Sequence, residues 1–335
     1  MTESTRPRVL CTALTSETGP HFEILRAAGF DCRLVDRRLD LWNAEALVEA
    51  LSGSVAVIAG SEPYPRRVIE SLPELRAICR AGVGFDAVDL EACEDACVIV
   101  ATTPGVNHHA VAEHALAMLL AVARGFPELD RHVRAGDWKR PFHPRVMGST
   151  LGIVGLGRIG QAVATRAVGL GMKVLVCEPA PNEEFVRQWN LELTELDDLL
   201  ARSDFVSLHL PMSAENHHLM NAARFARMKR GAVLINTARG PLVDERALVA
   251  ALQAGHLGGA GLDVFEIEPL PLDSPLLECE RVLLAPHVGG LDSEAHADCF
   301  AMCAETIVAL REGGWPAPCI RNRRGTEGWR WFRAR

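Results

Sequence analysis

Short apolar runs alternate with longer amphipathic stretches along the whole chain. In the first hundred or so residues, the apolar runs predict strands, and an amphipathic stretch that ends at Gly29 predicts a short helix. The predicted strands are residues 8–13, 55–60, 76–79 and 98–101, and the helix is residues 22–28. Strands that alternate with helices predict a parallel sheet with helices on both faces.

The strongest helical pattern covers residues 110–124, which are rich in Ala, Leu and Met and apolar on nearly every side. A helix of this kind is buried on several sides, and we expect it to link two domains. The next segment, residues 131–147, is less periodic and richer in Pro, His, Arg and Trp, which is typical of a surface arm or an oligomer contact.

A second α/β unit begins near Thr150. Its first strand is the apolar run that starts at Leu151, and further strands are predicted at residues 172–177, 205–210, 232–236, 261–265 and 282–285. Helices are predicted at residues 161–169, 196–202, 244–254 and 293–310, and the last is expected to pack back on the first unit. The pattern therefore predicts an α/β chain with two doubly wound, Rossmann-like parallel sheets.

The composition limits the classes of partner. The chain has 335 residues, 48% hydrophobic and 23% charged, which is enough for two domains with substantial cores. Its net charge of −8 argues against nucleic acid or an anionic membrane as the main partner. The longest apolar run, residues 115–123, is far shorter than the ~20 residues that span a bilayer, and residues 1–8 lack a secretory pattern. We therefore expect a cytoplasmic protein.

Ten cysteines are present, and several lie inside apolar runs, namely Cys11, Cys79, Cys177 and Cys303. That placement is typical of small buried side chains in a reducing compartment rather than of a disulfide framework. The pairs at residues 93/97 and 299/303 lack a second Cys or His pair at zinc-finger spacing. The adjacent histidines at residues 108–109 and 217–218 are expected to point in different directions. No metal site is expected.

A Gly-x-Gly-x-x-Gly turn follows the strand that starts at Leu151. In such a turn Gly155 allows the sharp bend, Gly157 lets the backbone approach a pyrophosphate, and Gly160 lets the helix pack close to the strand. A second strand ends at Glu178, about twenty residues further on, where an acid that binds the ribose hydroxyls is expected. Together these features predict a dinucleotide site. The alternative is an ordinary glycine-rich turn between a strand and a helix.

Three polar segments follow predicted strands of the second unit, at the edge where open parallel sheets bind ligands. They contain Arg239, the acidic residues of the segment 263–268 (Asp-Val-Phe-Glu-Ile-Glu), and His287. A histidine exchanges protons near neutral pH, a carboxylate orients its ring, and a guanidinium holds a substrate carboxylate, which suits hydride transfer at a carbonyl carbon. Alternatively, Arg239 caps a helix or pairs with Asp244, Glu268 is a solvated acid, and His287 is a packed core residue.

Six motifs occur together, in order, between about Val55 and Leu310. They are residues 80–86 (Arg-Ala-Gly-Val-Gly-Phe-Asp), 111–114 (Val-Ala-Glu-His), 152–160, 236–240 (Asn-Thr-Ala-Arg-Gly), 262–269 and 286–289 (Pro-His-Val-Gly). In this set and order the chain resembles the D-isomer-specific 2-hydroxyacid dehydrogenases, in particular the bacterial 3-phosphoglycerate-dehydrogenase-like branch.

The resemblance implies a fold in which a cofactor domain is inserted into a substrate domain. Residues 1–102 and 289–335 would form the substrate domain, and residues 103–288 the NAD-binding Rossmann domain. The active site would lie in the cleft, and its closure would exclude water. Such enzymes are usually dimers or tetramers, and the arm at residues 131–147 would lie at the interface.

The resemblance also implies roles for single residues. Arg239 would bind the substrate, Glu268 would pair with the catalytic histidine, and His287 would be the acid and base. Val83 and Gly84 match a loop whose N–H groups help Arg239 to hold the substrate carboxylate. The implied dinucleotide contacts are Gly155, Gly157, Arg158, Ile159, Gly160, Glu178, Thr237, Ala238, Arg239, Asp263, His287 and Gly289. Within this set, Asp263 would lie near the carboxamide.

Three positions depart from the family pattern. Glu178 replaces the usual Asp, but it still reaches the ribose hydroxyls and its charge repels a 2′-phosphate, so that the expected cofactor is NAD. Ala87 replaces a common Asn, and Pro241 replaces a common Gly. Both lie near substrate-side loops, so they bear on the identity of the substrate more than on the chemistry.

The resemblance thus implies an NAD-dependent oxidoreductase that interconverts a D-2-hydroxy acid and its 2-oxo acid. Phosphoglycerate is the first candidate substrate, and glyoxylate or hydroxypyruvate the second. No Arg or Lys cluster in the substrate loops marks a phosphate pocket. Phosphite dehydrogenase is an alternative on the same scaffold, and an NAD-sensing corepressor-like binding protein is the alternative outside enzymes. Formate dehydrogenase is disfavoured because that branch usually has Gln in place of Glu268.

The composition changes from Trp315 onward, where arginines lie among aromatic residues. The residues concerned are Arg321, Arg323, Arg324, Trp329, Arg330, Trp331, Phe332, Arg333 and Arg335. This tail is predicted either to bind a partner or nucleic acid, or to be a terminal extension that is loosely ordered or packed on a neighbouring subunit.

Overall fold

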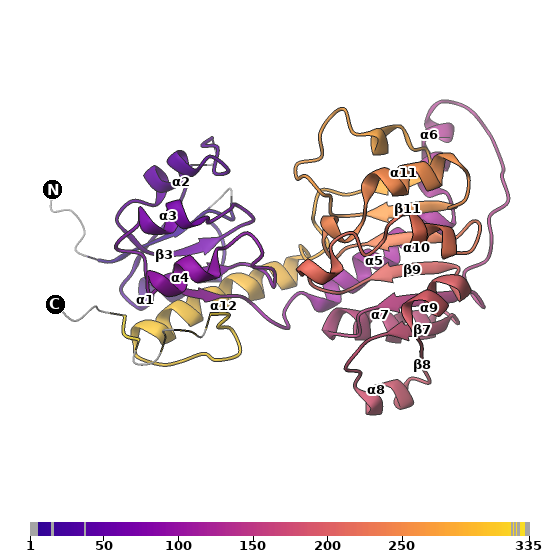
Figure 1. Ribbon diagram of the computed structural model, residues 1–335. Helices are drawn as coiled ribbons and strands as arrows, with labels where there is room; N and C mark the ends of the chain where they lie inside the picture. The colour runs from indigo at the N-terminus through magenta and orange to yellow at the C-terminus, as the bar shows by residue number, and fades with distance from the viewer. Residues whose placement is uncertain are drawn as a thin grey trace. The chain divides into compact units, whose positions relative to one another are not determined.

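The chain folds into two α/β units, each built on its own parallel sheet (Figure 1). The computed structural model describes residues 6–14, 17–36, 38–322, 324, 326 and 329–331. The first unit comprises residues 1–107 and 292–335, and the second comprises residues 108–291. The predicted fold class, with one doubly wound domain inserted into another, is therefore confirmed.

The first sheet has five strands in the order β2-β1-β3-β4-β5. Successive strand residues alternate between its faces, so that Cys11 and Ile58 pack with α1 and α12, whereas Leu10 and Val57 pack with α2, α3 and α4. The elements are β1 (Arg8–Cys11), α1 (Pro20–Ala27), β2 (Asp31–Leu34), α2 (Ala44–Leu51), β3 (Ser54–Ala59), α3 (Arg66–Glu70), β4 (Ala77–Arg80), α4 (Leu90–Asp95), β5 (Ile99–Ala101) and α12 (Ser293–Arg311).

The long helix α12 brings the last part of the chain back to the first unit. It lies beside α1 (Figure 1), and its buried side chains, which include Phe300 and Ile307, pack against the first sheet. This contact confirms the expectation that residues 293–310 return to the first unit.

The second sheet has seven strands in the order β12-β11-β10-β9-β6-β7-β8. Helices α5 and α7 cover one face, and α9, α10 and α11 cover the other. The elements are α5 (His108–Ala123), α6 (Phe126–Arg134), β6 (Thr150–Val154), α7 (Arg158–Gly169), β7 (Lys173–Cys177), α8 (Glu183–Gln188), β8 (Glu192–Leu193), α9 (Leu196–Arg202), β9 (Phe205–Leu208), α10 (Ala222–Arg227), β10 (Val233–Asn236), α11 (Glu245–Gln253), β11 (Gly259–Leu262) and β12 (Val282–Leu284).

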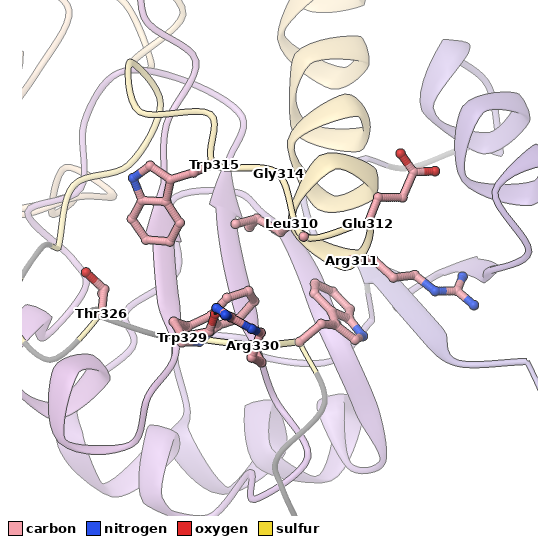
Figure 2. A pocket seen from close by; sticks show the side chains of 10 residues that line it. Leu310, Arg311, Glu312, Gly314, Trp315, Thr326, Trp329 and Arg330 are labelled. Carbon is pink, nitrogen blue, oxygen red and sulfur yellow. The ribbon is translucent and has the colours of Figure 1, made fainter.

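The described part of the C-terminal tail packs on its own unit. Binding of a partner, of nucleic acid or of a neighbouring subunit by this tail stays a prediction. Ile320 pairs antiparallel with Ala101 of the edge strand β5, and Asn322 hydrogen-bonds the backbone on either side of Ile99. Three tryptophans of the tail line a pocket at the end of α12 (Figure 2), namely Trp315, Trp329 and Trp331. Arg323, Phe332, Arg333 and Arg335 lie outside the described residues.

The cysteines are free thiols and most are buried. Burial raises the pKa of Cys32 and of Cys93 to about 12, which makes both thiols unreactive. Within the described residues, no group of three or more His, Cys, Asp or Glu is placed to hold a metal ion. The paired histidines do not point apart as predicted, because the ring centroids lie 4.0 Å apart both in His108–His109 and in His217–His218.

No single helix of the described chain is long and apolar enough to cross a membrane. Helices α5 and α6 reach that length only together, as a pair bent by 61°.

Candidate active site

The Gly155–Gly160 turn joins β6 to α7 near the middle of the second sheet. Gly155 has φ of +95°, and a Cβ atom there would lie 2.5 Å from the carbonyl oxygen of His209. A Cβ atom on Gly160 would lie 2.1 Å from the carbonyl oxygen of Gly155. Both positions therefore require glycine. The space beside Gly157 is open, so a ligand can approach its backbone.

The N-terminus of α7 offers donors for an anion. Among the described residues, none accepts a hydrogen bond from the N–H groups of Gly157, Arg158 or Ile159. Such N–H groups and the helix dipole favour a phosphate. Glu178 lies against the same turn, because its Oε2 accepts a hydrogen bond of 2.8 Å from the N–H of Leu156.

A histidine beyond β9 lies opposite the glycine turn. Strands β6 and β9 are neighbours from which the chain continues in opposite directions, and this is the point where doubly wound sheets bind ligands. His209 follows β9, and its Nε2 lies 2.8 Å from Ser207 Oγ. Burial lowers the pKa of His209 to about 4, so the ring is neutral at pH 7. The sequence gives no separate signal for His209, because the apolar pattern predicts one strand over residues 205–210 that includes it.

The loop after β10 carries Thr237, Ala238 and Arg239. Asn236 fixes this loop, because its Oδ1 accepts from the Ala238 N–H (3.1 Å) and its Nδ2 donates to the Arg239 carbonyl oxygen (2.8 Å). Thr237 Oγ1 is buried and has no hydrogen-bond partner among the described residues. A buried hydroxyl without a partner is costly, which fits a position that a ligand completes.

The loop after β11 touches the loop after β10. A Cβ atom on Gly240 would lie only 1.8 Å from the carbonyl oxygen of Phe265. The half-buried Arg239 is thereby held beside the segment that leads to Glu268. Arg239 Nη1 donates a hydrogen bond of 2.6 Å to the Ala238 carbonyl oxygen. Asp244 caps α11, because its Oδ1 accepts a hydrogen bond from the Ala247 N–H. The alternative that Arg239 pairs with Asp244 stays a prediction.

Glu268 and His287 form a hydrogen-bonded pair. His287 Nδ1 lies 2.7 Å from Glu268 Oε2, and Glu268 Oε1 accepts from the Phe265 N–H at 3.0 Å. Burial alone would raise the pKa of Glu268, but the contact with His287 lowers the pKa overall, so Glu268 is ionised. The His287 side chain is 46% exposed. The alternative of a packed core histidine therefore does not describe His287. The Glu268 side chain is 34% exposed, so it contacts solvent as well as the His287 ring.

Asp263 holds the backbone that carries His287. The His287 N–H donates to the Asp263 carbonyl oxygen at 2.8 Å, and the buried Asp263 carboxylate accepts from the N–H groups of Val288 (2.9 Å) and Gly289 (2.8 Å). His114 Nε2 lies 3.3 Å from the same carboxylate. Burial would raise the pKa of Asp263, but these donors lower it overall. These contacts fix His287 at φ of +56°, which is unfavourable for a non-glycine residue. A contact between Asp263 and the carboxamide stays a prediction.

Val83 and Gly84 lie in the first unit, in the loop after β4. Arg80 Nε donates to the Gly84 carbonyl oxygen at 3.1 Å, and the Gly82 carbonyl oxygen accepts from the Thr103 N–H at 2.9 Å. Among the described residues, none accepts a hydrogen bond from the N–H groups of Val83 and Gly84. These two donors suit a small anion.

Known proteins share this arrangement of sequence and fold. Residues 116–289, more than half of the chain, match the family model for the NAD binding domain of D-isomer specific 2-hydroxyacid dehydrogenases. The chain belongs to this family. It is therefore an oxidoreductase that acts on the CH–OH group of 2-hydroxy acids, and its cofactor is NAD. The donors at α7, the open space at Gly157 and the buried Thr237 hydroxyl all fit a bound dinucleotide.

Relatives within the family are similar to this chain over most of its length and most of theirs. The chain is 40% identical over 329 residues to a glyoxylate reductase of Korarchaeum cryptofilum, covering 93% of this chain and 95% of the relative. It is 40% identical over 278 residues to the glyoxylate/hydroxypyruvate reductase B of Klebsiella pneumoniae, covering 81% and 86%. The crystal structure of the TT0316 protein from Thermus thermophilus has a TM-score of 0.84 at 39% identity, covering 93% and 99%.

Proposed function

We propose that this dehydrogenase reduces glyoxylate and hydroxypyruvate with NADH. Sequence motifs alone rank phosphoglycerate first, but two relatives at 40% identity carry the names of glyoxylate and hydroxypyruvate reductases. The observation that carries the proposed chemistry is the 2.7 Å contact between His287 Nδ1 and Glu268. Because this contact engages Nδ1, Nε2 is the nitrogen that exchanges a proton with the substrate.

In the proposed mechanism, bound NADH supplies the hydride and the residues of the chain handle charge and protons. Protonated His287 gives its Nε2 proton to the carbonyl oxygen as the substrate is reduced, and it takes that proton back in the reverse direction. Ionised Glu268 stabilises the imidazolium and fixes the orientation of the ring. Arg239 holds the substrate carboxylate through its paired donors, and the N–H groups of Val83 and Gly84 help to bind it.

A substrate panel tests this proposal. NADH oxidation is followed with glyoxylate, hydroxypyruvate and 3-phosphohydroxypyruvate, and NAD reduction with phosphite. We expect the highest kcat/KM for glyoxylate or hydroxypyruvate. A clear preference for the phosphorylated acid would instead favour a 3-phosphoglycerate dehydrogenase, and tight NADH binding without turnover would indicate an NAD-sensing protein.

We also propose that Glu178 selects NAD over NADP, because its carboxylate binds ribose hydroxyls and repels a 2′-phosphate. Glu178→Ala is expected to raise the Kd of NADH about 10- to 100-fold, because charge-assisted hydrogen bonds to the ribose are lost. The same variant is expected to show a smaller preference for NADH over NADPH. Fluorescence titration with both cofactors measures this change, with the exposed Glu184→Ala on α8 as the matched control. A wild-type protein that already prefers NADPH would contradict the role of Glu178.

We propose further that the chain forms a homodimer or homotetramer through α6 and residues 135–147. This segment exposes large apolar side chains, among them Trp138 at 79% and Phe142 at 103%. Exposed apolar surface of this kind marks interaction sites.

The double variant Trp138→Glu, Phe142→Glu is expected to be monomeric, because buried unpaired charges at an interface cost several kcal/mol. Light scattering after size exclusion measures the mass. Trp42→Glu, at a 50% exposed position of the first unit, is the matched control. A monomeric wild type, or a double variant of unchanged mass, would refute this interface.

A further inference from the structure

A buried polar cluster occupies the ligand-binding position of the first sheet. Thr12 follows β1, and Glu62 and Tyr64 follow β3. Strands β1 and β3 are neighbours from which the chain continues in opposite directions along the sheet, which is where such sheets bind ligands. All three side chains are at most 1% exposed. The crevice at this point is thus filled by the protein itself.

One carboxylate oxygen gathers the donors of the cluster. Glu62 Oε1 accepts hydrogen bonds from the Tyr64 hydroxyl (2.7 Å), the Gly60 N–H (3.2 Å) and the Thr12 hydroxyl. Burial and the Glu62 carboxylate raise the pKa of Tyr64, so its hydroxyl remains a donor. A buried carboxylate is tolerated only with such partners, which ties the loops after β1 and β3 together.

The backbone of Tyr64 continues this connection to the Val83–Gly84 loop. Its N–H donates to the Ala87 carbonyl oxygen at 2.7 Å, and its carbonyl oxygen accepts from the Asp89 N–H at 3.0 Å. Tyr64 therefore closes the far end of the loop, whereas Arg80 holds the Gly84 carbonyl oxygen at the near end. The shape of the loop thus depends on where Tyr64 lies.

We propose that Glu62 is a positioning residue for substrate binding, which holds Tyr64 and thereby keeps the N–H groups of Val83 and Gly84 aimed at the substrate carboxylate. The inference rests on the proposed function, since it takes the substrate to be a 2-oxo acid bound at this loop. The Val83–Gly84 loop binds the substrate carboxylate, which does not react. Disorder of the loop therefore weakens binding of the substrate equally in the ground state and in the transition state. Such a loss raises KM and leaves kcat nearly unchanged.

Glu62→Leu removes the acceptor, and Glu62→Gln keeps an amide oxygen in its place. For Glu62→Leu we expect KM for the best 2-oxo acid, and the inhibition constant of the unreactive analogue oxamate, to rise about 10- to 100-fold. The kcat is expected to stay within roughly threefold, the Kd of NADH to be unchanged, and Glu62→Gln to restore most of the affinity.

Two further variants keep the test decisive. Tyr64→Phe removes one hydroxyl and is expected to raise KM about threefold or more, even where Glu62→Leu does not fold. Ser54→Ala removes a buried hydrogen bond to Leu51 at the opposite end of β3, so it is expected to lower Tm without changing KM. Unchanged KM in Tyr64→Phe and in folded Glu62→Leu, or KM changes no larger than in Ser54→Ala, would overturn the proposal. If the wild type reduces neither glyoxylate nor hydroxypyruvate, the proposed function fails, whereas KM for whichever 2-oxo acid is reduced still tests Glu62.

Discussion

Replacement of His287 by alanine is expected to lower kcat by ~10²–10⁴ with little change in NADH affinity, because it removes the group that exchanges a proton with the substrate oxygen. The hydrogen bond to Glu268 leaves one ring nitrogen for this exchange. Stopped-flow or steady-state NADH oxidation gives kcat, and fluorescence titration gives the Kd of NADH. Glu268→Gln is expected to give a smaller loss, since it keeps a hydrogen-bond acceptor but no longer stabilises the imidazolium.

The matched control for this prediction is His217→Ala. His217 is exposed in the same unit and belongs to neither the glycine turn nor the Glu268–His287 pair. Its replacement should leave kcat unchanged. Near-normal turnover of the His287→Ala protein would remove His287 from the mechanism.

Replacement of Arg239 by alanine is expected to lower kcat/KM about 30- to 5,000-fold. This range corresponds to roughly 2–5 kcal/mol, which is the cost of losing a buried charge pair with the substrate carboxylate. Arg239→Lys should recover only part of the loss, because an ammonium group cannot donate the same paired hydrogen bonds. Initial rates over a range of 2-oxo acid concentrations separate KM from kcat.

Arg246→Ala, at an exposed position of the nearby helix α11, is the control for general loss of charge. We expect it to be neutral. If Arg239→Ala instead weakens NADH and leaves KM for the 2-oxo acid unchanged, Arg239 belongs to the cofactor site rather than to the substrate site.

The sequence predicts the site well where the functional residues come directly after a predicted strand. The carboxyl ends of parallel strands meet at one edge, so Glu268 and His287, 19 positions apart, lie in contact. The glycine roles are also readable, because Gly155 and Gly160 each lie where a Cβ atom would collide with backbone. In both cases the motif itself contains the physical constraint.

Other features depend on pairings that no local pattern contains. Strand β2 is a four-residue edge strand with the sequence Asp-Cys-Arg-Leu, too short for a clear alternation. The cluster of Thr12 and Glu62 joins residues 50 positions apart, and neither resembles a known motif. The backbone contacts of Asp263 likewise appear only once β11 and the loop after β12 lie side by side.

The division of the first unit between the two ends of the chain has a consequence for biosynthesis. Its core combines Val9 and Phe30 from the start of the chain with Phe300 and Trp331 near the end. On the ribosome, residues 108–291 emerge as a complete unit while the first unit still lacks α12. The nucleotide-binding unit can therefore fold first, whereas the amino-terminal sheet keeps the part of its apolar face that α12 covers exposed until α12 has been synthesised.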